Sequence, residues 1–188
     1  WGQSYMDVCV ALTAEFAVTA SDDHTLRVWN WQSGKRLRVL KGHTHQVLCV
    51  ALSGDFAVSA SADHTLRAWN WRTGKLLRTL EGHMGTVWSV ALSGEFAVSA
   101  SNDHTLRVWN WHTGELLRTL EGHMGTVRSV ALSGDFAVSA SHDASLRVWN
   151  WRTGEALPIL GRLPGGFLCV ALSGDFAVSA SDDHTLRV

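Results

Sequence analysis

Short apolar runs alternate with turn residues along the chain, and residues 41–80 show the pattern clearly. Each run is about five residues long and rich in valine, leucine and small side chains, as expected of β-strands. The runs are 47–52, 56–61, 65–69 and 76–80. Gly54, between the first two runs, suits the positive φ of a type II′ hairpin turn. No segment of useful length shows the apolar periodicity of a helix. We therefore predict that these four runs form one sheet of four antiparallel strands.

The same pattern returns every 40 residues. The string Phe-Ala-Val-(Ser/Thr)-Ala-Ser begins at Phe16, Phe56, Phe96, Phe136 and Phe176. Residues 81–120 and 121–160 are identical at 31 of 40 positions, which points to recent duplication or to consensus design. The units are 1–40, 41–80, 81–120, 121–160 and an incomplete 161–188. A small sheet that is apolar on both faces needs neighbours, and radial stacking of such sheets predicts a β-propeller.

Several motifs recur together at this spacing. They are Gly-His at 42–43, 82–83 and 122–123, Ser-x-Asp at 61–63 and Leu-Arg-x-Trp-Asn at 66–70. Through these motifs the chain resembles the WD40 repeat family over essentially its whole length, with Trp-Asn in place of the family's Trp-Asp. The resemblance implies an all-β propeller of four-stranded antiparallel blades. It also implies one domain over 1–188, with about five units and no outer strand in the last blade.

The fifth unit holds three expected strands and stops at Val188. We expect the chain to be a fragment of a longer propeller or repeat array. One alternative is closure as five blades with an incomplete last one. Another is self-association through the unpaired edge of the last blade, since an uncovered strand edge recruits partners.

The second, third and fourth units each carry a His, a Ser, an Asp and a Trp in fixed order. The sets are His43, Ser59, Asp63 and Trp69; His83, Ser99, Asp103 and Trp109; and His123, Ser139, Asp143 and Trp149. A Ser/His/Asp set suggests catalysis, but enzymes rarely carry three copies of one active site. The resemblance to WD40 blades implies a structural tetrad, in which the hydroxyl accepts from the indole and the imidazole bridges to the Asp.

Spacing leaves both Ser59 and Ser61 open as the hydroxyl of the second unit, and Ser59 is preferred. Gln3 replaces the tetrad His in the first unit, and Leu163 replaces it in the last. These terminal units should be held less firmly, as terminal repeats often are.

Charge and composition exclude several classes of function. The net charge is −1, which gives no basic footprint for nucleic acid, and we expect no nucleic-acid partner. The apolar runs are far shorter than a membrane-spanning helix, so we expect no membrane insertion. The first residues lack a signal-peptide pattern. An intracellular, cytoplasmic location is therefore expected.

Three cysteines share one repeat position. They are Cys9, Cys49 and Cys169, and the other two units carry Ser89 and Ser129 there. If each unit is a separate structural element, the thiols lie too far apart for a disulfide or for shared metal ligation. We expect buried, reduced thiols in a reducing compartment.

Ten histidines raise the question of a metal site. The only pair close in sequence, His43 and His45, lacks a third ligand nearby, whereas zinc sites need three or four converging groups. Phosphate-binding loops and nucleophile elbows are absent from the sequence. We therefore expect no metal and no cofactor.

Positions that differ between nearly identical units indicate where binding is located. They lie just before the tetrad Asp and around the start of the first strand, at one end of each blade. In the WD40 family this end is the usual partner-binding face. The expected face comprises Met6, Val8, Asp22, Gln46, Leu48, Ala62, Thr86, Trp88, Asn102, Thr126, Arg128, His142, Leu168 and Asp182. Trp88 and Arg128 are of the types enriched in interface hot spots; the alternative is drift at unconstrained positions.

These patterns favour a non-catalytic scaffold that binds protein or peptide partners. The alternative is a structural or oligomerising repeat array, natural or consensus-designed, without a dedicated ligand. An enzyme is the least favoured hypothesis, because no asymmetric cluster of titratable groups is visible.

Overall fold

The computed structural model describes residues 7–162, 166–173 and 176–188, and these residues form five antiparallel sheets. The first sheet contains β1 (Asp7–Leu12), β2 (Phe16–Ser21), β3 (Thr25–Asn30) and β4 (Lys35–Lys41). The second contains β5 (Val47–Ser53), β6 (Phe56–Ser61), β7 (Leu66–Asn70) and β8 (Lys75–Leu80). The third contains β9 (Val87–Ser93), β10 (Phe96–Ser101), β11 (Leu106–Asn110) and β12 (Glu115–Leu120). Each sheet follows chain order from its inner to its outer strand.

The last two sheets depart from this plan at their outer strands. The fourth contains β13 (Val127–Ser133), β14 (Phe136–Ser141), β15 (Ser145–Asn150), β16 (Glu155–Ala156) and β17 (Gly161–Arg162). The fifth contains β18 (Phe167–Ser173), β19 (Phe176–Ser181) and β20 (Leu186–Arg187). The all-β class, the four-stranded units and the three-stranded last unit are as the sequence predicts.

In residues 41–80 the strands begin and end within one residue of the predicted bounds. Ser53 pairs with Phe56, which leaves Gly54 and Asp55 as a two-residue hairpin loop. Gly54 has a φ of 55°, the left-handed value that a type II′ turn needs at its first central residue. The same glycine recurs in the third and fourth units with φ of 57° and 54°.

Pro158 explains why the outer strand of the fourth sheet is broken into β16 and β17. Proline has no N–H to donate to a ladder, so the strand pairs with β15 only before and after it. Two backbone bonds keep the intervening chain beside β15, from Leu157 N–H to Val148 O and from Leu160 N–H to Leu146 O, both at 2.9 Å.

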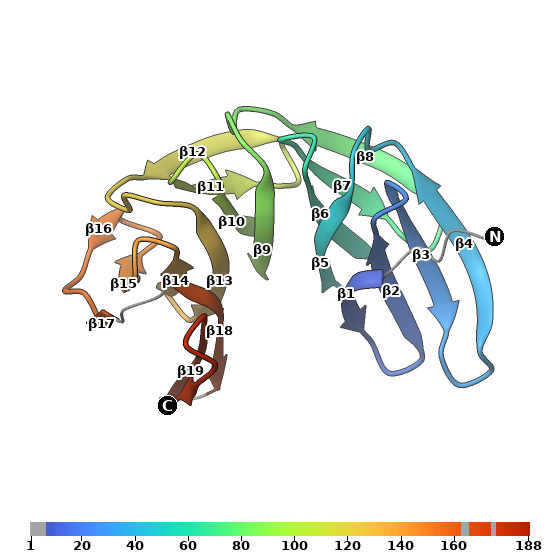
Figure 1. Cartoon of the computed structure of the whole chain (residues 1–188). Helices are drawn as coiled ribbons and strands as arrows, with labels where there is room; N and C mark the ends of the chain where they lie inside the picture. The colour runs from blue at the N-terminus through green and yellow to red at the C-terminus, as the bar shows by residue number, and fades with distance from the viewer. Residues whose placement is uncertain (1–6, 163–165, 174–175) are drawn as a thin grey trace.

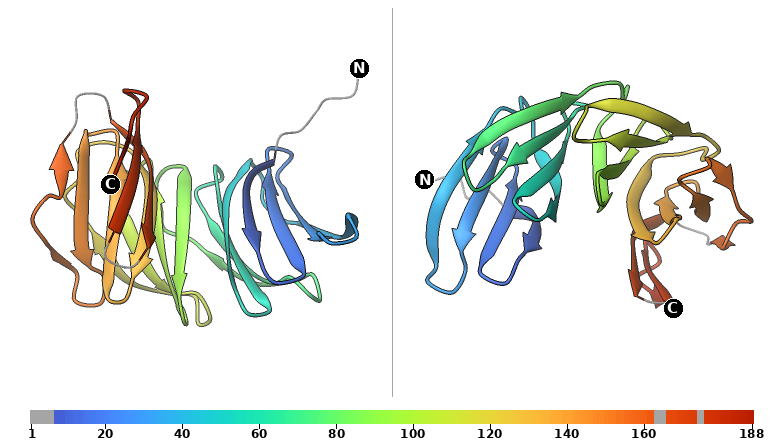
Figure 2. Two further views of the ribbon diagram at one scale, coloured as in Figure 1. Left: turned by 90° about the horizontal axis from the view of Figure 1, so that it is seen from below. Right: turned by 180° about the vertical axis from the view of Figure 1, so that it is seen from behind.

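The sheets stand side by side along an open arc (Figure 1). The inner strands β1, β5, β9 and β13 line its concave side, and the outer strands β4, β8 and β12 its convex side (Figures 1 and 2). The first and fifth sheets lie at opposite ends of the arc in every view (Figures 1 and 2).

The core of the molecule lies between sheets. One cluster joins Val18 and Leu26 of the first sheet to Val47, Val50 and Trp69 of the second. Equivalent clusters join the second sheet to the third and the third to the fourth. At about 25 cal/mol per Å² of apolar surface removed from water, this packing is the main stabilising term. A single sheet could not bury its own side chains, so each unit requires a neighbour.

Candidate functional site

His43 bridges two turns of the second unit. Its Nδ1–H donates to Asp63 Oδ2 at 2.7 Å, and its Nε2 accepts from the Ser59 hydroxyl at 2.8 Å. The Ser59 oxygen accepts from the Trp69 indole N–H at 2.9 Å. Ser59, and not Ser61, therefore contacts His43; the Ser61 oxygen instead accepts from the Asp63 backbone N–H at 3.1 Å.

The third and fourth units repeat this chain of hydrogen bonds. In the third, the bonds are His83–Asp103 at 2.7 Å, His83–Ser99 at 2.7 Å and Trp109–Ser99 at 2.9 Å. In the fourth, they are His123–Asp143 at 2.8 Å, His123–Ser139 at 2.7 Å and Trp149–Ser139 at 2.8 Å. All three serines are 0% exposed, so a substrate cannot reach their hydroxyls. The geometry is suited to joining strands rather than to nucleophilic attack.

Burial governs the charge state of the tetrad. It lowers the pKa of His43 against the opposing effect of Asp63, so the imidazole is neutral at neutral pH and can accept the Ser59 proton. Burial would by itself raise the pKa of Asp63, but hydrogen bonds from His43 and Thr65 outweigh it. They hold that pKa well below the usual range. Each tetrad thus pairs a neutral imidazole with an ionised carboxylate.

The first unit lacks this arrangement in its described part. Trp29 donates to Thr19 Oγ1 at 3.1 Å, and Arg27 binds both Asp23 and the Ser21 hydroxyl. Gln3 and Leu163, which replace the tetrad His in the first and last units, lie outside the described residues.

The recurrent His that follows the tetrad Asp has a conformational explanation. His24, His64, His104 and His184 have φ between 63° and 70°, and Ala144 takes the same place with a φ of 66°. His belongs to the few non-glycine types enriched in this left-handed region. Within the described residues, no group of three or more His, Cys, Asp and Glu is placed to hold a metal ion.

A β-bulge sets the most variable position of each unit apart from the ladder. In β5, Val47 pairs with Ser61 and Cys49 with Ala60, so Leu48 has no partner opposite it. The same register shift occurs in β1, β9, β13 and β18. Bulges re-aim side chains without ending a strand. The bulge residues are Val8, Leu48, Trp88, Arg128 and Leu168.

Trp88 and Arg128 are brought into direct contact. The guanidinium carbon of Arg128 lies 3.8 Å from the Trp88 ring centroid, a close cation–π distance. Arg128 Nε also donates to His142 Nε2 at 2.9 Å. Burial lowers the pKa of Arg128, and Asp182 opposes that shift. The indole N–H of Trp88 is buried and makes no hydrogen bond to the described residues.

Four of these bulge residues line a hollow of about 400 Å³ on the concave side of the arc. Leu48, Trp88, Arg128 and Leu168 form its wall, with Cys9, Cys49, Ser89, Ser129 and Cys169 beside them. The wall therefore combines two leucines, an indole and a cation.

The other expected face residues lie in the two adjoining turns. Ala62, Asn102, His142 and Asp182 donate backbone N–H groups to the carbonyls of Gln46, Thr86, Thr126 and Gly166, at 2.8–3.2 Å. The Thr126 hydroxyl reaches Asn102 Oδ1 in the preceding unit at 2.7 Å. Asp22 has one buried carboxylate oxygen with no partner in the described structure. Met6 and the side chain of Val8 lie outside the described residues.

A family model described as WD domain, G-beta repeat matches residues 4–30, 34–70, 74–110 and 114–150. The chain belongs to the WD40 family. WD40 repeats are generally protein-interaction scaffolds, and the family is typically non-catalytic. None of the curated proteins gives a significant match to the chain. Across the described residues, no helix has the length and apolar character needed to cross a bilayer.

The cysteines of this WD40 chain correct the sequence-based prediction. The Sγ atoms of Cys9 and Cys49 are 3.8 Å apart, because the inner strands of neighbouring WD40 units converge. Cys169 Sγ lies 3.8 Å from Ser129 Oγ in the same way. The expectation that separate units keep the thiols far apart was therefore wrong. Burial was also overestimated, since Cys9 and Cys49 are half-buried and Cys169 is exposed.

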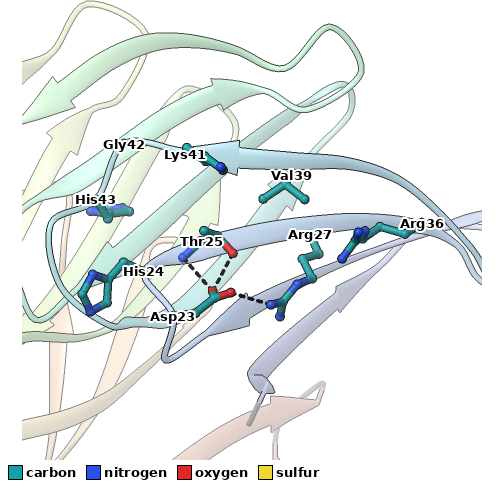
Figure 3. A pocket seen from close by; sticks show the side chains of 9 residues that line it. All are labelled: Asp23, His24, Thr25, Arg27, Arg36, Val39, Lys41, Gly42 and His43. Atoms are coloured by element: carbon teal, nitrogen blue, oxygen red, sulfur yellow. Dashed lines mark hydrogen bonds and ion pairs between the residues drawn. The ribbon is translucent and has the colours of Figure 1, made fainter. Parts of the chain in front are cut away.

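A second hollow, of about 460 Å³, lies against the outer part of the first WD40 unit (Figure 3). Arg27, Arg36 and Lys41 contribute cations to it, and Asp23 is tied to Arg27 and Thr25. The net charge of −1 for the whole chain does not reveal this local excess of positive charge. A unit-by-unit comparison could have found it, because Glu81 and Glu121 occupy the place of Lys41.

We predict that Ser139→Ala lowers the free energy of unfolding by about 1–3 kcal/mol, because two buried groups, the Trp149 indole N–H and His123 Nε2, lose their partner. Urea denaturation followed by tryptophan fluorescence measures the change. Ser133→Ala, at an exposed position of the same unit, is the matched control and should change stability by less than about 0.5 kcal/mol. Equal effects of the two substitutions would contradict the role assigned to the hydroxyl.

We predict that stability falls as the pH is lowered from 7 to 5. A histidine whose pKa is lowered in the folded state binds fewer protons there than in the unfolded chain, so acid favours unfolding below about pH 6.5. Each tetrad His contributes at most about 1.4 kcal/mol per pH unit. His83→Gln should reduce the slope of unfolding free energy against pH, measured by urea titrations across this range. An unchanged slope would show that His83 does not carry this linkage.

Proposed function

We propose that this WD40 chain is a non-catalytic scaffold that binds a protein or peptide across the end of the units bearing the bulge residues. The observation that carries the proposal is the Trp88–Arg128 pair, held at 3.8 Å in the wall of a hollow. Tryptophan and arginine are the types most enriched among residues that dominate binding energy.

Charge and exposure support a partner with an acidic group. Arg128 supplies the positive charge among the residues that line the hollow, and this half-buried residue contacts both Trp88 and His142. Leu48 and Leu168 provide apolar surface on either side of the pair, and Leu168 is 42% exposed. An extended peptide with a carboxylate between two apolar side chains would satisfy both features.

The test is a selection of binding peptides from a displayed library, followed by affinity measurements on purified variants. Trp88→Ala and Arg128→Ala should each weaken the selected peptides by about tenfold or more, since truncating an interface hot spot costs over about 1.4 kcal/mol. Arg72→Ala, in the turn after β7 at the opposite end of the unit, is the control and should leave affinity unchanged. Peptides that bind both hollow variants as tightly as the parent chain would reject this face.

A second candidate function is assembly with another copy of the chain. At each inner junction, the face of one unit around Val50 packs on the face of the preceding unit around Val18 and Leu26. The first unit exposes the face that corresponds to the one around Val50, and Val10 on it is 56% exposed. The fifth unit exposes the face that corresponds to the one around Val18 and Leu26, and Leu186 on it is 75% exposed. The two exposed faces are therefore complementary, as a head-to-tail interface requires.

Light scattering on a size column tests this second function. Assembly predicts a mass above the 20.6 kDa of one chain, rising with concentration. Val10→Asp should return the mass to 20.6 kDa, because it places a charge on the interface, whereas Leu76→Asp on the outer strand β8 should not. A mass of 20.6 kDa at every concentration would reject assembly and leave the peptide-binding function to be judged by its own test.

A further inference from the structure

Two thiols from neighbouring units meet on the concave side of the arc. Cys9 in β1 and Cys49 in β5 have their Sγ atoms 3.8 Å apart, close to van der Waals contact. Each sulfur also lies near a carbonyl of the following unit, Cys9 at 3.8 Å from Val50 O and Cys49 at 3.8 Å from Val90 O. Both residues are half-buried and line the hollow described above, which gives small solutes a route to the Cys9 sulfur.

The pairing is confined to the first junction. At the next positions around the concave side the chain has Ser89 and Ser129, so Cys49 faces a hydroxyl on its other flank. Cys169 contacts Ser129 Oγ at 3.8 Å. The same strand position therefore supplies one dithiol, two serines and one separate thiol. Cys169, which has no neighbouring thiol in the described part of the chain, can therefore serve as a control for the reactivity of the Cys9–Cys49 pair.

We propose that Cys9 and Cys49 form a peroxide-sensitive dithiol that oxidises to a disulfide and covalently joins the inner strands of the first and second units. Although both cysteines line the hollow proposed to bind peptides, their oxidation requires no partner and is tested separately from peptide binding. A disulfide needs an S–S distance of about 2.05 Å, so the sulfurs must approach by less than about 2 Å through side-chain rotation.

The reaction balances with hydrogen peroxide as the two-electron oxidant. The Cys9 thiolate attacks one peroxide oxygen, the O–O bond breaks, and hydroxide leaves to give a sulfenic acid. The sulfur of Cys49 then attacks the Cys9 sulfur, forming the S–S bond and releasing the sulfenic oxygen as water. The two thiol protons and the peroxide together yield two molecules of water.

Electrostatics assigns the order of the two steps. The hydrogen bond with Cys49 lowers the pKa of Cys9 to about 6, so Cys9 is the nucleophile toward peroxide. The same contact together with burial raises the pKa of Cys49, which therefore keeps its proton until the sulfenic acid forms beside it. Cys9 attacks and Cys49 resolves.

The experiment treats the whole 188-residue chain with hydrogen peroxide and follows thiol titration, intact mass and a non-reducing peptide map. We expect the three free thiols to fall to one, with loss of two hydrogens and a Cys9–Cys49 cross-linked peptide. Dithiothreitol should restore all three. The midpoint of thermal unfolding should rise on oxidation, since the cross-link restricts the unfolded chain.

Serine substitutions provide matched variants, because serine already occupies this position in the third and fourth units. Cys169→Ser should still lose two thiols to one disulfide. Cys9→Ser and Cys49→Ser should form no intramolecular disulfide, and Cys49→Ser should accumulate the sulfenic acid at Cys9, detected with dimedone. Phenylarsine oxide bridges two neighbouring thiols. It should add one arsenic to the parent chain and to Cys169→Ser, and none to Cys9→Ser or Cys49→Ser.

Three outcomes would overturn the proposal. The first is oxidation of all three cysteines at one rate, without a cross-linked peptide. The second is a disulfide between chains in place of the internal one. The third is an equal response of Cys9→Ser and the parent chain to both peroxide and phenylarsine oxide. Circular dichroism of each variant, compared with the parent, ensures that a lost disulfide reflects the missing thiol and not an unfolded chain.

Discussion

The packing of one sheet on the next is the constraint from which the rest of the structure follows. Each unit presents apolar side chains on both faces, and each core cluster draws from two units, as Val18 with Trp69 in the first junction shows. A sheet built in this way has no core of its own. Its stability depends on its neighbours, so the array gains most of its free energy at junctions and comparatively little inside units.

The repeated polar residues serve this packing by fixing the shape of each sheet. The bonds from Trp69 through Ser59 and His43 to Asp63 connect two strands and the turns that flank them. They lie within one unit, so they hold its strands and turns in the shape that packs against the next unit. Buried polar chains of this kind are favourable only when every member has a partner, which explains why the four residues recur together.

The sequence was informative about most features that repeat. Strand bounds, the hairpin glycine and the family follow from the 40-residue period, since the same local physics acts in every unit. Ser59 and Ser61 both fit the spacing, and only the strand register shows which hydroxyl faces His43. The contact of Cys9 with Cys49 was missed for a related reason. A period counts distance along the chain, whereas radial stacking brings equivalent inner positions of neighbouring units together.

The bulge has a consequence for how such a chain could evolve. A residue outside the ladder can be exchanged without altering register or core, so Leu48, Trp88 and Arg128 are readily interchangeable. Near-identical units also favour unequal recombination, which adds, removes or reorders whole units at once. Each such event would rewrite the order of bulge side chains along the concave side while preserving the framework. New binding specificities could then arise by shuffling intact units, faster than point mutation alone would allow.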